Sequence, residues 1–124
     1  MKPYIKTATA DTPSVILDAD RGIFEISQMS LPEDAVDLYA PILSWLREYA
    51  QDPNPDTVFN MKLEYFNTAS SKQLIQVLLI LQEMEKRSNV LVKWFYKEID
   101  EDMLSLGEEY KQIMKVPFEL IVVP

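Results

Sequence analysis

The chain has 124 residues, of which 48% are hydrophobic and 26% are charged, and its formal net charge is −8. This length and composition fit one globular domain with a single hydrophobic core, and they exclude a disordered chain. The negative charge disfavours nucleic acid and anionic membrane surfaces as partners, because both are densely negative.

Absent residue types exclude several kinds of chemistry. The sequence has no cysteine and no histidine, which removes thiol nucleophiles, thiolate metal sites and the usual acid–base group near neutral pH. Two glycines, Gly22 and Gly107, are too few for a dinucleotide-binding fingerprint or a P-loop. We therefore expect no catalytic residue, no cofactor and no metal. The N-terminus lacks the apolar core of a secretory signal, and the longest apolar run, Val77 to Leu81, is far too short to cross a membrane, so we expect a cytoplasmic protein.

A hairpin and a helix are predicted in the first half of the chain. Residues 15–17 and 23–26 favour two strands joined by a tight turn at Gly22. A helix is predicted after Ser30, with Ser30 as its N-cap and Pro32 in its first turn. Pro41 lies within this helix and should bend it. The run from Gln51 to Asp56 ends it.

Strands and helices alternate in the second half. Residues 58–66 alternate apolar with polar side chains, which predicts a strand with one buried and one solvated face. The later pattern predicts helix 69–88, strand 90–96, helix 100–114 and strand 118–123. This order indicates parallel pairing. We expect residues 1–124 to form a single two-layer α/β domain, with a mixed sheet of about five strands and three main helices largely on one face.

The starts of the three predicted helices differ in charge. The first opens with Glu33 and Asp34, and the third opens with Asp100, Glu101 and Asp102, so each offsets its own positive end. The middle helix follows Asn67 with Thr-Ala-Ser-Ser-Lys-Gln, and its first acid is Glu83. Its free N–H groups, with Lys72 one turn in, suit an incoming anion, above all a phosphate.

This helix start supports two interpretations. A phosphate on Thr68 would bring about −1.5 to −2 charges to a helix end that can accommodate them. Asn and Thr are equally ordinary helix caps, and Ser70 and Ser71 are tolerated in a first turn, so the segment could serve capping alone. Spacing by itself favours a cap, because helix caps are far commoner than phosphorylation sites.

The segment Tyr65 to Lys72, read as Tyr-Phe-Asn-Thr-Ala-Ser-Ser-Lys after an alternating strand, resembles the signature of the SiaC family of bacterial regulatory phosphoproteins. The upstream stretch Thr12 to Val15, then Gly22, then Ser30 to Glu33, is similar to that family in order and spacing. The resemblance covers most of the chain. It implies a STAS-like domain, related to the anti-sigma-factor antagonists.

The resemblance also implies a function and a site. It implies a non-catalytic signalling protein that switches partners when Thr68 is phosphorylated, with Asn67, Ser70, Ser71 and Lys72 as the local frame. The implied partners are a GHKL-type kinase, a PP2C-like phosphatase and a downstream effector such as a diguanylate cyclase. Two departures from the family pattern stand out. Ala69 replaces a frequent second hydroxyl, and the stretch 28–30 lacks a glycine expected before the Ser-x-Pro-Glu element.

Two other functions are considered. One is a constitutive protein-interaction or scaffold domain in which the Thr68 segment is only a helix cap, and the other is a small hydrolase or ligand-binding enzyme, which the missing residue types disfavour. The middle helix is also apolar over more than one stripe, from Leu74 to Met84. This indicates a central helix covered by both neighbours, or else an apolar patch beside Thr68 that a partner could contact.

Overall fold

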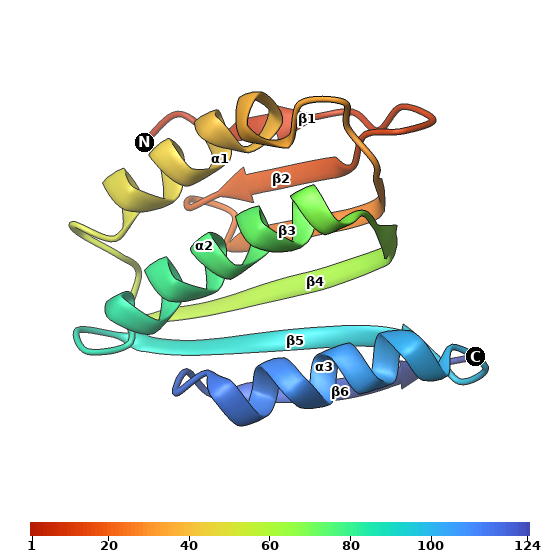
Figure 1. Ribbon diagram of the computed structural model, residues 1–124. Coiled ribbons are helices and arrows are strands. Elements are labelled where there is room, and N and C mark those ends of the chain that lie inside the picture. The colour runs from red at the N-terminus through yellow and green to blue at the C-terminus, as the bar shows by residue number, and fades with distance from the viewer.

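A computed structural model describes all of residues 1–124 as one sheet with three helices (Figure 1). Along the chain the elements are β1 (Tyr4–Lys6), β2 (Ser14–Asp18), β3 (Ile23–Ser30), α1 (Ala35–Tyr49), β4 (Asp56–Phe66), α2 (Thr68–Met84), β5 (Asn89–Lys97), α3 (Glu101–Ile113) and β6 (Phe118–Val123). The strands lie side by side in the order in which they occur in the sequence. The predicted mixed α/β class is confirmed, with six strands rather than about five.

The sheet has an antiparallel part and a parallel part. Strands β1, β2 and β3 pair antiparallel, and β3, β4, β5 and β6 pair parallel, with one helix in each parallel connection. The predicted hairpin is confirmed as β2–β3. Its turn contains Gly22 at φ 67°, and Asp18 Oδ1 accepts the Arg21 N–H at 3.2 Å. The strand that the sequence did not reveal is β1, which is three residues long.

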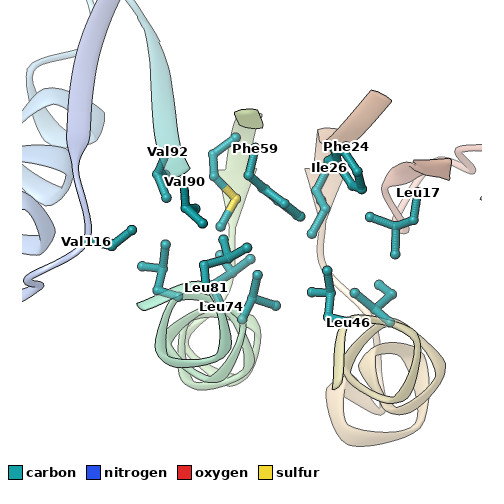
Figure 2. Packing of buried hydrophobic residues seen from close by; sticks show 14 of the residues in the cluster. Leu17, Phe24, Ile26, Leu46, Phe59, Leu74, Leu81, Val90, Val92 and Val116 are labelled. Carbon is teal, nitrogen blue, oxygen red and sulfur yellow. The ribbon is translucent and has the colours of Figure 1, made fainter. Parts of the chain in front are cut away.

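All three helices cover the same face of the sheet (Figure 1). The core lies between this face and the helices, where Phe59 of β4 and Ile26 of β3 point toward Leu74 of α2 and Leu46 of α1 (Figure 2). One cluster of 26 buried hydrophobic residues spans the sheet and every helix. Burial of this apolar surface is the dominant favourable term in folding.

The other face of the sheet carries polar residues along β4, as the alternation predicted. Lys62 forms an ion pair with Glu25 of β3 at 3.1 Å, and Lys97 of β5 pairs with Glu64 at 2.9 Å. These side chains are partly or largely exposed, so each pair contributes little to stability. Their positions show that this face of the sheet is exposed to solvent.

The start of α1 corrects one prediction. The N-cap is Asp34, whose Oδ1 accepts the Asp37 N–H at 3.0 Å, and Pro32 precedes the helix. The prediction that Ser30 caps this helix was wrong, since Ser30 is the last residue of β3 and is fully buried. An acidic cap is favoured here because it also interacts with the helix dipole. The helix continues through Pro41 to Tyr49.

The two later helices are shorter than predicted. Helix α2 begins at Thr68 and ends at Met84, four residues before the predicted end at Ser88. Helix α3 runs from Glu101 to Ile113, and its Gly107 packs against the Trp94 ring of β5. None of the three helices combines the length and the apolar composition that a membrane crossing requires.

Candidate functional site

The candidate site is the junction at which β4 passes into α2. Asn67 has an extended backbone and caps the helix, because its Oδ1 accepts the Ser70 N–H at 2.8 Å. Its carbonyl oxygen accepts the Ser71 N–H at 3.0 Å, and its own N–H donates to the Ser30 carbonyl of β3 at 3.1 Å. Asn67 thus fixes the first turn of α2 against the end of the neighbouring strand.

The three hydroxyl groups of this turn differ in accessibility. Thr68 is exposed, and its side chain forms no hydrogen bond within the protein. Ser70 is fully buried. Ser71 is half-buried, and its Oγ donates to the Thr68 carbonyl at 2.7 Å. Only the Thr68 hydroxyl is therefore both exposed and free of internal partners.

The Ser70 hydroxyl belongs to a buried chain of hydrogen bonds. Its Oγ donates to the Ser30 carbonyl at 3.0 Å and lies 2.8 Å from the Ser30 Oγ, which is 2.7 Å from the Tyr39 hydroxyl of α1. Since Ser70 has only one proton, the Ser30 hydroxyl donates to Ser70 and Tyr39 donates to Ser30. Every donor is satisfied, and the chain joins β3, α1 and α2 beneath Thr68.

Burial of this chain affects the titration of Tyr39. Desolvation raises the pKa of the Tyr39 phenol above its ordinary value of 10.0, while hydrogen bonding to Ser30 opposes this shift. Desolvation dominates because the negative phenolate would lose its water in the core. The Tyr39 hydroxyl is accordingly a neutral, structural donor across the physiological pH range.

The electrostatic contrast among the helix starts is present in the structure. Asp34 and Asp100 cap α1 and α3, and both helices carry acids in their first turns, whereas α2 has a neutral cap and no acid there. The N–H groups of Thr68 and Ala69 have no partner within the protein. Lys72, one turn further on, is exposed and forms no ion pair. This helix end is the least neutralised of the three.

A backbone irregularity lies in β3, beside the strand that leads into the site. Gln28 has φ 73°, and the β3–β4 register shifts between Gln28 and Met29. This left-handed conformation favours glycine, because a Cβ crowds the following carbonyl. A glycine was expected in stretch 28–30, and Gln28 takes the left-handed conformation in its place.

The structure brings most of the predicted site residues together. The first turns of α2 carry Thr68, Ser71 and Lys72, and Asn67 caps the helix. Ser70 points into the core instead. Ser30 and Tyr39 support this turn but were not recognised as site residues. Only the three-dimensional fold brings them to this turn, since Ser30 lies 40 residues before Ser70 in the sequence.

Packing explains most of the apolar breadth of α2, although Leu79 is 42% exposed. Five of its apolar side chains are buried, and they are Leu74, Val77, Leu78, Leu81 and Met84. The exposed residues of the first turns are Thr68, Ala69 and Lys72, so those turns carry no large apolar patch. The exposed aromatic group nearest to Thr68 in the sequence is Tyr65 of β4, with 56% of its surface accessible.

The chain is similar to proteins of Pseudomonas aeruginosa over nearly its whole length. An uncharacterized protein of strain UCBPP-PA14 is 26% identical over 113 residues, which is 90% of each chain. The structure of SiaC superposes with a TM-score of 0.89 at 22% identity, covering 99% of this chain and 100% of that one. A chain in the structure of the diguanylate cyclase SiaD in complex with its activator SiaC superposes with a TM-score of 0.90 at 24% identity, covering 97% and 99%.

The family assignment comes from the sequence as a whole. The profile described as SiaC family regulatory phosphoprotein matches residues 6–123. This match extends from the end of β1 to the end of β6 and includes the whole β4–α2 junction. The chain therefore belongs to the SiaC family of regulatory phosphoproteins.

Proposed function

We propose that this protein is a non-catalytic signalling protein that is switched by reversible phosphorylation of Thr68. Its unmodified form binds a downstream enzyme, and its phosphorylated form releases it. The observation that carries the proposal is the exposed Thr68 hydroxyl at the only helix start without an acidic residue. Membership of a family of regulatory phosphoproteins supports it.

The local structure can hold a phosphate without unfolding. A phosphate on Thr68 lies next to the free N–H groups of Thr68 and Ala69 and at the positive end of the α2 dipole. Asn67 continues to cap the helix, because its hydrogen bonds do not involve the Thr68 side chain. The modification thus changes the charge of the surface while the fold persists.

The change of charge acts on a partner seated at this end of the sheet. About −1.5 to −2 charges added at the exposed Thr68 have to be desolvated in any contact made there, which weakens binding. The effector proposed here is a diguanylate cyclase, because a structurally similar SiaC chain occurs in complex with one. A GHKL-type kinase and a PP2C-like phosphatase, both implied by the sequence resemblance, would set the phosphorylation state in the cytoplasm.

The order of strands supports a role without catalysis. Ligand crevices in parallel sheets form where the strand order reverses, and here the parallel strands follow one another from β3 to β6 without a reversal. The parallel part of the sheet therefore has no strand-order reversal of the kind at which such ligand crevices form. Kinase and phosphatase supply the chemistry, and this chain supplies the hydroxyl and the surface.

The direct test is intact-mass spectrometry after incubation with the cognate kinase and ATP. We expect one phosphate on the wild type and none on Thr68→Ala. Ser71→Ala is the matched control, because it removes a hydroxyl from the same helical turn, and it should still gain one phosphate. A mass increase that persists in Thr68→Ala would refute the proposed acceptor.

A constitutive scaffold domain is the second candidate. The complete Asn67 cap favours it, because the start of α2 is stable without any modification. In that case Thr68→Asp would leave the affinity for the downstream partner unchanged. The switch predicts instead that Thr68→Asp weakens this binding in part, since a carboxylate carries less charge than a phosphate.

A further inference from the structure

The free edge of β6 exposes a regular row of backbone hydrogen-bonding groups. The Val92 N–H donates to the Pro117 carbonyl at 2.9 Å, and the Glu98 N–H donates to the Val123 carbonyl at 3.1 Å. Because the β5–β6 register is continuous, the odd-numbered residues of β6 face β5. The N–H and C=O groups of Phe118, Leu120 and Val122 therefore point outward, away from the sheet.

The two edges of the sheet differ in protection. Strand β1 is three residues long, follows Pro3, and lies next to the Lys2 carbonyl, which accepts a hydrogen bond from Trp45 of α1 at 2.9 Å. Strand β6 is six residues long, pairs in continuous register and has Glu119 as its only charged residue. Short length, proline and charge are the usual protections of an edge strand. Within β6 only Glu119 gives such protection, although Pro117 and Pro124 flank the strand.

The surroundings of this edge specify what would pair with it. Helix α3 lies over β5 and β6 (Figure 1) and carries four acidic residues against the single Lys111. A hollow of about 610 Å³ lies at the end of β6, lined by Tyr96, Glu98, Leu104, Val122, Val123 and Pro124. An apolar side chain fits its mostly hydrophobic wall, and a basic side chain complements Glu98 and the acidic α3, while Glu119 lies opposite Lys93 in the β5–β6 register.

We propose that the β6 edge binds an extended segment of a partner protein in which apolar and basic residues alternate. The segment adds a seventh strand, hydrogen-bonded to the outward groups of Phe118, Leu120 and Val122. This site is separate from Thr68, so the proposal does not depend on the phosphorylation switch. A second copy of this chain is a poorer occupant, because pairing two β6 edges brings two acidic α3 helices together.

A synthetic peptide of alternating lysine and valine tests the site. Binding is measured by calorimetry, and the backbone amides are followed by hydrogen exchange in the full-length chain. We expect saturable binding that slows exchange at Leu120 and Val122. A peptide of alternating glutamate and valine should not bind. Exchange that is unchanged at both amides would overturn the proposal, as would equal binding of the acidic peptide.

The variant Val122→Pro distinguishes strand pairing at the β6 edge from non-specific attraction of a basic peptide to an acidic protein. The N–H lost in this variant points outward, and an edge strand tolerates proline there. We expect the fold to persist and the affinity for the basic peptide to fall at least about tenfold. Val122→Ile is the control, because it keeps the N–H, the β-branched shape and the apolar wall of the hollow, and it should bind far more tightly than Val122→Pro. Unchanged affinity in Val122→Pro, or a dimer of the wild type that Val122→Pro dissociates, would contradict the proposal.

Discussion

Asn67 and Thr68 are neighbours with different roles at the start of α2. The Asn67 side chain accepts the Ser70 N–H at 2.8 Å, while the Thr68 side chain is exposed and makes no internal hydrogen bond. The structural cap and the proposed phosphorylation site are therefore separate residues. Under the proposed switch, a phosphate on Thr68 would change binding with little effect on the stability of the helix.

Substitution of these two residues should separate their roles. Asn67→Ala should lower the free energy of unfolding by about 1 kcal/mol, because the Ser70 N–H loses its acceptor. Thr68→Ala should change it by less than about 0.5 kcal/mol, as is usual for an exposed residue without partners. Urea unfolding measures both. A loss in Thr68→Ala as large as that in Asn67→Ala would show that Thr68 shares the capping role.

Gln28 is the second informative single residue. Its φ of 73° is unfavourable for a side chain with a Cβ, so Gln28→Gly should raise the free energy of unfolding by about 1 kcal/mol. Gln76 is a matched control, because it is exposed within α2, where glycine should lower stability by about 1 kcal/mol. Thermal unfolding of the two variants should move in opposite directions. A loss of stability in both would show that Gln28 is not strained.

At the scale of elements, α3 lies close to the sheet because it contains a glycine. A Cβ at Gly107 would lie 2.5 Å from Trp94 Cδ1 and 2.8 Å from Leu120 Cδ2. The Trp94 ring cannot yield easily, since its Nε1 donates to the Met103 carbonyl at 3.0 Å and its ring contacts Tyr110 edge-on. The glycine is thus a packing requirement within the helix.

Gly107→Ala tests this requirement. It should lower the free energy of unfolding by about 1–3 kcal/mol through overpacking, although alanine favours helix by about 1 kcal/mol. Ser105→Ala, at an exposed position of the same helix, should be neutral or slightly stabilising. Chemical denaturation compares the two. If Gly107→Ala were the more stable variant, the close contact with Trp94 would be disproved.

At the scale of the whole molecule, buried tyrosines couple stability to alkaline pH. Burial raises the pKa of Tyr39 and Tyr110 above 10.0, with the Glu109 charge also raising that of Tyr110. The unfolded chain releases these protons near pH 10, while the folded chain keeps them to higher pH. The folded state then binds more protons, so the contribution of these tyrosines to the free energy of unfolding is fully present below their ordinary pKa of 10.0 and is lost as the pH rises above it.

The alkaline fall can be measured by urea unfolding between about pH 8 and pH 11, a range that spans the ordinary tyrosine pKa of about 10. Tyr39→Phe should reduce the slope above pH 10, because one of the coupled protons is gone. The slope is the readout, since the loss of the hydrogen bond to Ser30 also lowers stability at every pH. An identical slope in Tyr39→Phe would exclude Tyr39 as a source of the effect.

The sequence predicts the parts of this fold that depend on local patterns. Alternation along β4 revealed which face is buried, and the missing acids after Asn67 distinguished the α2 start from the other two. Features set by distant contacts were missed or misread. Strand β1 is too short to show a pattern, and Ser30 resembled a helix cap although it serves a buried hydrogen-bond chain with Tyr39 and Ser70.

The central claim is that a phosphate on Thr68 changes binding while the fold is kept. The most direct measurement is the calorimetric affinity of the cognate diguanylate cyclase for the protein prepared unmodified and with phosphothreonine at position 68. We predict that phosphorylation weakens binding by at least about tenfold, while the two forms keep the same circular dichroism spectrum. Equal affinities of the two forms would contradict the claim.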